Sequence, residues 1–239
     1  MIRAGEADIA LCGGTEATVH TVSLGGFVAA RALSTNFNDT PERASRPFDR
    51  DRDGFVMGEG AGLLVVETLQ HALARGAKPL AEIIGYDTSS DAYHLASGAE
   101  DGDGAKRAMS IALHQAQLTP EDIQHLNAHA TSTQIGDKGE LAAIKGIFGE
   151  SPGLVVTSTK SATSHLLGAA GGIETLFTAL ALRDQIIPPT LNLDNPDETA
   201  TGIDNVSGKA RPLAIERALS NGFGFGGVNA SILLKRWTE

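Results

Sequence analysis

The sequence predicts an α/β fold in which strands and helices alternate along the chain and pack in layers. Short apolar runs, typical of buried strands, alternate with segments of helical periodicity. The chain has 28 glycines and only 5% aromatic residues, a composition that favours tight turns and close backbone packing. Two strands close the sequence around a glycine-rich turn, which predicts a mixed sheet.

The first elements are short. Residues 9–14 are an apolar run that ends in two glycines, and we expect a buried strand there. Residues 62–69 are a second apolar run containing β-branched residues, which predicts another strand. A short helix over 69–76 should end at Gly76, and a third strand is expected over 80–90.

A longer helix is expected over residues 103–118, because alanine and methionine recur there at i, i+3 and i+4. Thr119, Pro120 and Glu121 then supply an N-cap, a proline at the first helical position and an acidic first turn, which predicts another short helix. The remaining expected elements are a strand at 123–130, a helix at 136–149, a strand at 153–161, an apolar helix at 168–185, an extended piece at 186–192 and a strand pair within 218–237.

Bulk composition excludes several classes of protein. The 239 residues are enough for one large domain or two small ones. The net charge of -10 is spread thinly without a basic stripe, so nucleic acid is not an expected partner. One cysteine excludes an internal disulfide framework and fits a reducing, cytoplasmic setting. We expect no membrane span and no signal peptide, because neither pattern is present.

The stretch "DRDRDGFVMGEG" raises the question of calcium. Asp49, Asp51, Asp53 and Gly54 occupy the first, third, fifth and sixth positions of an EF-hand loop. That loop requires a bidentate glutamate at its twelfth position, where this chain has Gly60. We therefore interpret the stretch as a surface loop of ion pairs that leads into a strand.

Three short polar segments follow expected strands, where α/β proteins usually place their sites. The first is "NAHATST", with Asn127, His129, Thr131 and Thr133. His125 and His129 form an H-x-x-x-H pattern, but the glutamate of the zinc motif is missing. A strand would also hold these imidazoles roughly 13 Å apart. A structural histidine is the expected role for either residue on this pattern alone, and no metal is expected.

The second segment, "STKSATSHLLGAAGG", places Lys160 and His165 in a Ser/Thr-rich turn between a strand and a long helix. The flanking elements are apolar enough to be buried. A buried lysine needs a carboxylate partner, and either Asp137 or Glu174 could supply one.

The third segment, "NGFGFGGVNAS", alternates glycine with Phe223 and Phe225. Such a backbone can bend, and its two rings can close a channel. Glycine in a strand costs stability unless another group must approach the backbone closely. The segment therefore indicates more than an ordinary hairpin.

In this order, the three segments resemble the β-ketoacyl-acyl-carrier-protein synthases, in particular the type II elongating enzyme of fatty acid synthesis. The family pattern is N-A-H-G-T-S-T, then S-T-K-S-x-T-G-H-L-L-G-A-A-G, then G-F-G-G-T-N. The stretches "RALSTNFNDTPERASRPFDRDRDGFVMGEGAG", "SSDAYH" and "PPTLNLDNPD" are also similar to the family. The resemblance runs from about Met1 to Glu239, and it assigns the acidic stretch to an ion-paired loop of the family.

The resemblance implies a thiolase-like fold of two similar α/β halves. Residues 1–75 would be the last part of the N-terminal half, and residues 76–239 the complete C-terminal half. The implied reaction is decarboxylation of malonyl-carrier protein and condensation of the resulting carbanion with an acyl chain. The implied partners are acyl carrier protein and acyl and malonyl thioesters. A homodimer or larger assembly is expected on a separate ground, because the apolar runs at 9–14 and 62–69 would present an uncovered edge. No cofactor is implied, because phosphopantetheine arrives on the carrier protein.

Residue roles carry over by motif. His129 and His165 match the two histidines whose N–H groups stabilise the enolate, and two such donors suit that charge. Lys160 matches the lysine near the second histidine, with Asp137 or Glu174 as its ion-pair partner. By the same resemblance, Thr131 and Thr133 are candidates for binding the phosphopantetheine arm, and Phe225 matches the ring that gates acyl-chain entry. Phe223 is a further substrate-binding candidate as the second ring that can close the channel.

The chain departs from the family in its nucleophile. The family cysteine lies in T-A-C-x-S, about one helix upstream of "GEADIALCGG", and this chain contains no such motif. Cys12 is not a substitute, because it falls within an apolar strand. We expect its thiol to be buried, with a raised pKa and low reactivity.

Three further departures lie beside the motifs. Ala130 and Ser164 replace glycines next to the two histidines, and Val228 replaces a threonine.

Two functions therefore remain open. One is a condensing enzyme that is inactive in this form, and the other is a non-catalytic or decarboxylase-only subunit resembling chain-length factors. A generic α/β scaffold does not explain the motifs.

Overall fold

The computed structural model describes residues 1–149 and 153–238. Its strands are β1 (Ile9–Glu16), β2 (Gly60–Glu67), β3 (Ala81–Ser90), β4 (His125–Asn127), β5 (Val155–Thr157), β6 (Ile186–Ile187), β7 (Asp204–Asn205), β8 (Arg211–Pro212), β9 (Arg217–Gly224) and β10 (Val228–Arg236). Its α-helices are α1 (Thr21–Ala29), α2 (Leu69–Ala74), α3 (Asp103–Ala116), α4 (Gln134–Phe148), α5 (Lys160–Thr163) and α6 (Ala170–Asp184). Within these residues, no helix is both long and apolar enough to cross a membrane.

A six-stranded mixed sheet forms the centre of the molecule, in the order β3-β10-β9-β4-β5-β7. The strands β3, β10 and β9 pair antiparallel, whereas β9, β4, β5 and β7 pair parallel. The α/β class, the mixed sheet and the closing strand pair are therefore confirmed. The antiparallel pair arises because the glycine-rich turn between β9 and β10 is short enough to reverse the chain directly.

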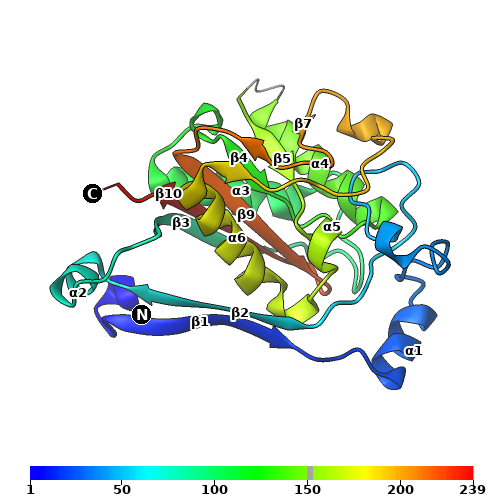
Figure 1. Cartoon of the computed structure of the whole chain (residues 1–239), viewed down its shortest axis with the longest axis horizontal. Coiled ribbons are helices and arrows are strands. Elements are labelled where there is room, and N and C mark those ends of the chain that lie inside the picture. Colours follow the sequence, from blue (N-terminus) through cyan, green and yellow to red (C-terminus); the bar gives the residue numbers. More distant parts are fainter. Residues whose placement is uncertain (150–152, 239) are drawn as a thin grey trace.

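The elements stack in layers (Figure 1). Helices α3 and α4 cover one face of the central sheet, and α6 covers the other. Beyond α6 lies a separate two-stranded sheet made of β1 and β2. Gly62 permits this close stacking, because a Cβ there would lie 2.1 Å from the backbone nitrogen of Ile173 in α6.

The core lies between the central sheet and its helices. One cluster packs α3 and α4 against the sheet around Met109, Leu126, Leu141 and Ile144. A second cluster packs α6 against the opposite face around Leu182 and Ile215. Because both faces are covered, β4 and β5 are fully buried, as expected for parallel strands.

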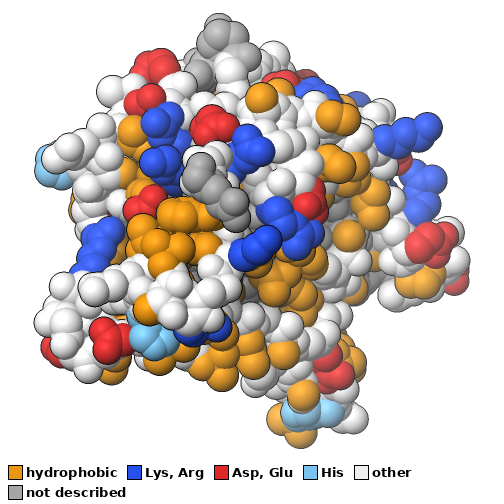
Figure 2. Space-filling view, turned by 60° about the vertical axis from the view of Figure 1, so that its left-hand side comes forward, with side chains coloured by type: hydrophobic (Ala, Val, Ile, Leu, Met, Phe, Trp, Pro, Cys, Tyr) orange, Lys and Arg blue, Asp and Glu red, His pale blue; other side chains and the backbone are white. Residues whose placement is uncertain are grey.

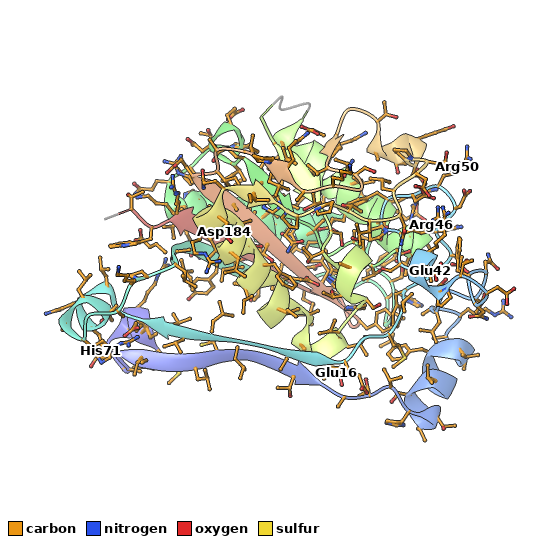
Figure 3. All side chains as sticks on the ribbon, viewed as in Figure 1. Glu16, Glu42, Arg46, Arg50, His71 and Asp184 are labelled. Carbon is orange, nitrogen blue, oxygen red and sulfur yellow. The ribbon has the colours of Figure 1, made fainter. Side chains whose placement is uncertain are left out.

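The acidic stretch is an ion-paired loop that leads into β2, as expected, but Asp49 and Arg52 within it are buried rather than on the surface. Arg46 Nε donates to Asp49 Oδ1 at 3.0 Å, and both side chains are buried. Arg52 lies 3.4 Å from Asp137 and 2.8 Å from Asp197. Among the described residues, no group of three His, Cys, Asp or Glu side chains could hold a metal ion. Figure 3 shows Arg46 at the end of the molecule that the loop occupies.

The strand β1 was expected to be buried, and the structure corrects this. Leu11 and Ile9 are exposed, and so are Leu63 and Val65 on the paired strand β2. Figure 2 shows hydrophobic side chains along the lower part of the molecule, where β1, β2 and α1 lie in Figure 1. The helix α1 was not predicted, because Gly25 and Gly26 interrupt its sequence.

The thiol of Cys12 is exposed, against the expectation of a buried and unreactive group. The reason is architectural, because β1 belongs to a two-stranded sheet rather than to the interior of the central sheet. At concentrations where the native chain is monomeric, we expect iodoacetamide to alkylate Cys12 at close to the rate in the urea-unfolded chain. Cys12→Ser provides the blank. Strong protection in the native state would show that the thiol is covered.

His125 is a fully buried imidazole in β4, and its Nε2 lies 3.0 Å from Thr157 Oγ1. Burial lowers its pKa from 6.5 to about 4. The native state therefore disfavours the protonated ring. Above pH 6.5 His125 has no effect on how the free energy of unfolding depends on pH. As the pH falls from 6.5 towards 4, His125 lowers that free energy, because the unfolded chain binds the proton more readily.

We expect His125→Gln to lose less stability on acidification than the wild type does. Glutamine can still hydrogen-bond to Thr157 but does not titrate. The variant should therefore avoid a loss of unfolding free energy on the order of 3 kcal/mol that His125 causes in the wild type at low pH. Urea unfolding at a series of pH values measures it, with exposed His94→Gln as the control. Equal pH slopes in wild type and His125→Gln would contradict the assignment.

Candidate active site

Two neighbouring parallel strands of the central sheet bring together the polar segments "NAHATST" and "STKSATSHLLGAAGG". The strands β4 and β5 pair in register, with Asn127 opposite Thr157. His129 follows the end of β4, and Lys160 begins α5 just after β5. Because parallel strands end at the same edge of a sheet, both residues lie at this edge.

His165 reaches the same place from the turn after α5. Its backbone nitrogen donates to Val56 O at 2.8 Å, and its carbonyl accepts from Gly58 N at 3.0 Å. The rings of His129 and His165 then meet edge to face, with centroids 5.2 Å apart. The structure thus brings together two histidines that lie in separate motifs.

Lys160 is completely buried beside this pair. Its Nζ lies 3.2 Å from His129 Nδ1 and 2.5 Å from Glu174 Oε1. Of the two expected carboxylate partners, Glu174 therefore forms the ion pair. Asp137 instead accepts from the backbone nitrogens of Phe48 and Ser132 and faces Arg52.

Both imidazoles are held neutral. Burial, followed by the charge of Lys160, places the pKa of His129 well below 6.5 and lowers that of His165 to about 3. Burial raises the pKa of Glu174 to about 7, although the Lys160 ammonium offsets part of the rise. Above that pH the pair is ionic.

The ammonium fixes the tautomer of His129. An ammonium has only N–H groups to donate, so Nδ1 of His129 must accept. The ring proton then lies on Nε2, on the other side of the imidazole. His129 therefore presents a neutral Nε2–H donor away from Lys160, which is the form needed to stabilise a developing oxyanion.

The substrate-binding candidates lie around the histidines. The hydroxyls of Thr131 and Thr133 are 3.0 Å apart, on the segment that follows His129. The ring of Phe223 lies 5.7 Å from that of His129. Phe225 is 55% exposed. Their roles in binding an arm or an acyl chain stay predictions.

Aromatic packing completes the surroundings of the pair. Phe55 lies edge to face against His165, with centroids 5.4 Å apart. Phe27 of α1 packs against Phe55 at 5.1 Å and lies 6.3 Å from Phe225. These two phenylalanines were not predicted, because neither belongs to a polar motif.

Glu140 is a further residue that the motifs did not reveal. Its carboxylate lies on α4 and accepts from the backbone nitrogens of His129 at 3.0 Å and Ala130 at 2.7 Å. Asn221 Nδ2 also donates to it at 3.0 Å. The sequence did contain a signal for Glu140, which is an acidic residue on the apolar face of an expected helix. A charge on a buried face needs partners, so such a residue is a candidate for a structural or functional contact.

Comparisons with known proteins identify the family. Residues 1–72 match the model of the β-ketoacyl synthase N-terminal domain, and residues 80–194 match that of the C-terminal domain. The chain belongs to the β-ketoacyl synthase family. It is 56% identical over 239 residues to 3-oxoacyl-[acyl-carrier-protein] synthase 2 of Rhizobium meliloti. The aligned region includes 100% of this chain and 56% of that relative.

Two solved ketosynthase structures share the fold. One is a type II PKS acyl-carrier protein in complex with its ketosynthase, matched at TM-score 0.95 and 37% identity over 99% of this chain and 58% of that one. The other is the ishigamide ketosynthase/chain length factor, at TM-score 0.91 and 38% identity over 99% and 56%. The thiolase-like α/β fold is thereby confirmed. The chain spans little more than half the length of these proteins.

We expect Glu140→Gln to destabilise the chain by about 1–3 kcal/mol, because the amide NH₂ would face a backbone N–H and leave it unpaired in the interior. Urea unfolding at about pH 8 measures the loss. Exposed Glu82→Gln on β3 is the matched control. An unchanged midpoint in Glu140→Gln would show that the carboxylate does not hold the His129 backbone.

Proposed function

We propose that this chain carries the decarboxylating half of a 3-oxoacyl-acyl-carrier-protein synthase site. The observation that carries the proposal is the neutral histidine pair, whose ring centroids lie 5.2 Å apart, with Lys160 Nζ hydrogen-bonded to Nδ1 of His129. Loss of CO₂ from a malonyl thioester leaves negative charge on the thioester oxygen. Imidazole N–H groups from His129 and His165 are suited to that oxygen.

The substrates and partners follow from the same proposal. Malonyl and acyl thioesters arrive on acyl carrier protein, whose phosphopantetheine arm serves in place of a cofactor. The hydroxyls of Thr131 and Thr133 bind that arm, and Phe223 and Phe225 border the acyl entrance. We place residues 1–75 in the first half-domain and 76–239 in the second. The separate β1–β2 sheet supports this division.

The condensation step needs a nucleophile to hold the acyl group. Cys12, the one cysteine in these 239 residues, lies in the middle of β1 and not at a helix N-terminus. We therefore propose that the chain in this form does not condense acyl and malonyl thioesters. The matching measurement is the formation of 3-ketoacyl product by the purified chain, with a complete family member as the positive control.

A second candidate is a subunit that binds acyl carrier protein without condensing, as a chain-length factor would. Two observations favour it, namely Ala130 and Ser164 beside the histidines and the similarity to a ketosynthase/chain length factor structure. In either case we propose a cytoplasmic protein that forms a homodimer. The exposed apolar side chains of β1 and β2 support association.

The first proposal predicts slow CO₂ release from malonyl-acyl-carrier protein by the wild-type chain. Each donor in a preorganised site is worth about 2.7–4 kcal/mol. His129→Ala or His165→Ala should therefore remove most of that release, on the order of a hundredfold. Release of labelled CO₂ measures the rate, and His94→Ala is the control on an exposed histidine. Equal rates in wild type and both site variants would favour the non-catalytic subunit.

A further inference from the structure

Ser164 has a backbone conformation that serine seldom adopts. Its φ is 64° and its ψ is -175°, between α5 and His165. This region of backbone space is essentially reserved for glycine and costs other residues on the order of 1–3 kcal/mol. The strain lies directly beside one of the two imidazoles of the site.

The neighbouring backbone holds Ser164 in this conformation from both sides. Its nitrogen donates to Lys160 O at 2.9 Å, and its carbonyl accepts from Thr163 Oγ1 at 3.0 Å. His165 is then anchored to Val56 and Gly58 by two backbone hydrogen bonds. A relaxed Ser164 would have to give up some of these contacts, so the strain opposes the turn that places His165.

His165 depends on that turn more than His129 does. His129 Nδ1 has Lys160 as a fixed partner at 3.2 Å. His165 Nδ1 is buried and has no hydrogen-bond partner among the residues that the structure describes. Its ring packs edge to face against Phe55 and His129, and the backbone that carries it sets its position.

We propose that Ser164 is a positioning residue that sets how firmly His165 is held opposite His129. The strained serine weakens the turn, so His165 leaves the paired arrangement more readily than it would behind a glycine. This inference rests on the proposed role of the histidine pair in decarboxylation. It makes residue 164 a determinant of the rate at this site rather than of the fold alone.

The test compares Ser164→Gly with Gln117→Gly. Gln117 caps α3 at φ 56° on the exposed surface, so glycine there also removes backbone strain but far from the histidines. Both variants should unfold at higher urea concentration than wild type. Only Ser164→Gly should raise the rate of CO₂ release from malonyl-acyl-carrier protein, by about threefold to tenfold, because small gains in placement have large effects on rate.

Imidazole NMR of the chain with ¹⁵N-labelled histidine gives a readout that is independent of activity. We expect the His165 signals to be broadened by exchange in wild type and in Gln117→Gly, and to sharpen in Ser164→Gly. Unchanged His165 signals in Ser164→Gly, alongside a gain in stability like that of Gln117→Gly, would overturn the inference. If no protein releases CO₂, the proposed decarboxylation fails, and the His165 signals alone then decide the role of Ser164.

Discussion

The site is organised around one buried charge. The Lys160 ammonium has no exposed surface, and a charge in that position is tolerated only when it is paired and hydrogen-bonded. Glu174 supplies the pairing from α6, and His129 supplies an acceptor from the segment after β4. Three separate elements are thus tied to one atom, and removing Glu174 would leave the buried ammonium without its counter-charge.

The two histidines are held in place by different interactions. His129 is oriented by an electrostatic partner behind its ring and by Glu140 beneath its backbone. His165 is oriented by backbone pairing and by aromatic edges. A site of this kind has one donor fixed by charge and one fixed by conformation. Changes in the backbone near His165 therefore affect the second donor first.

Much of the fold could be predicted, because its elements are long and periodic. The helix at 103–118 and the strand pair around the glycine-rich turn were both visible in the sequence. The exposure of β1 and Cys12 could not be predicted, because an apolar run has the same pattern whether or not another layer covers it. The helix α1 was missed because its two glycines oppose its local propensity.

The candidate site was predicted in part for similar reasons. Short polar motifs after strands identified His129, His165 and Lys160, and the parallel sheet brings them together. The choice between Glu174 and Asp137 depended on which helix face meets the lysine, and spacing along the chain does not give this.

The central claim is that the buried ammonium holds His129 as a neutral donor with its proton on Nε2. The most direct measurement is ¹⁵N NMR of the His129 imidazole in the wild-type chain and in Lys160→Met at about pH 8, where the pair is ionic. The account predicts an unprotonated Nδ1 and a protonated Nε2 in wild type, and loss of this strict preference in Lys160→Met. An Nδ1–H tautomer or an imidazolium in wild type would contradict it.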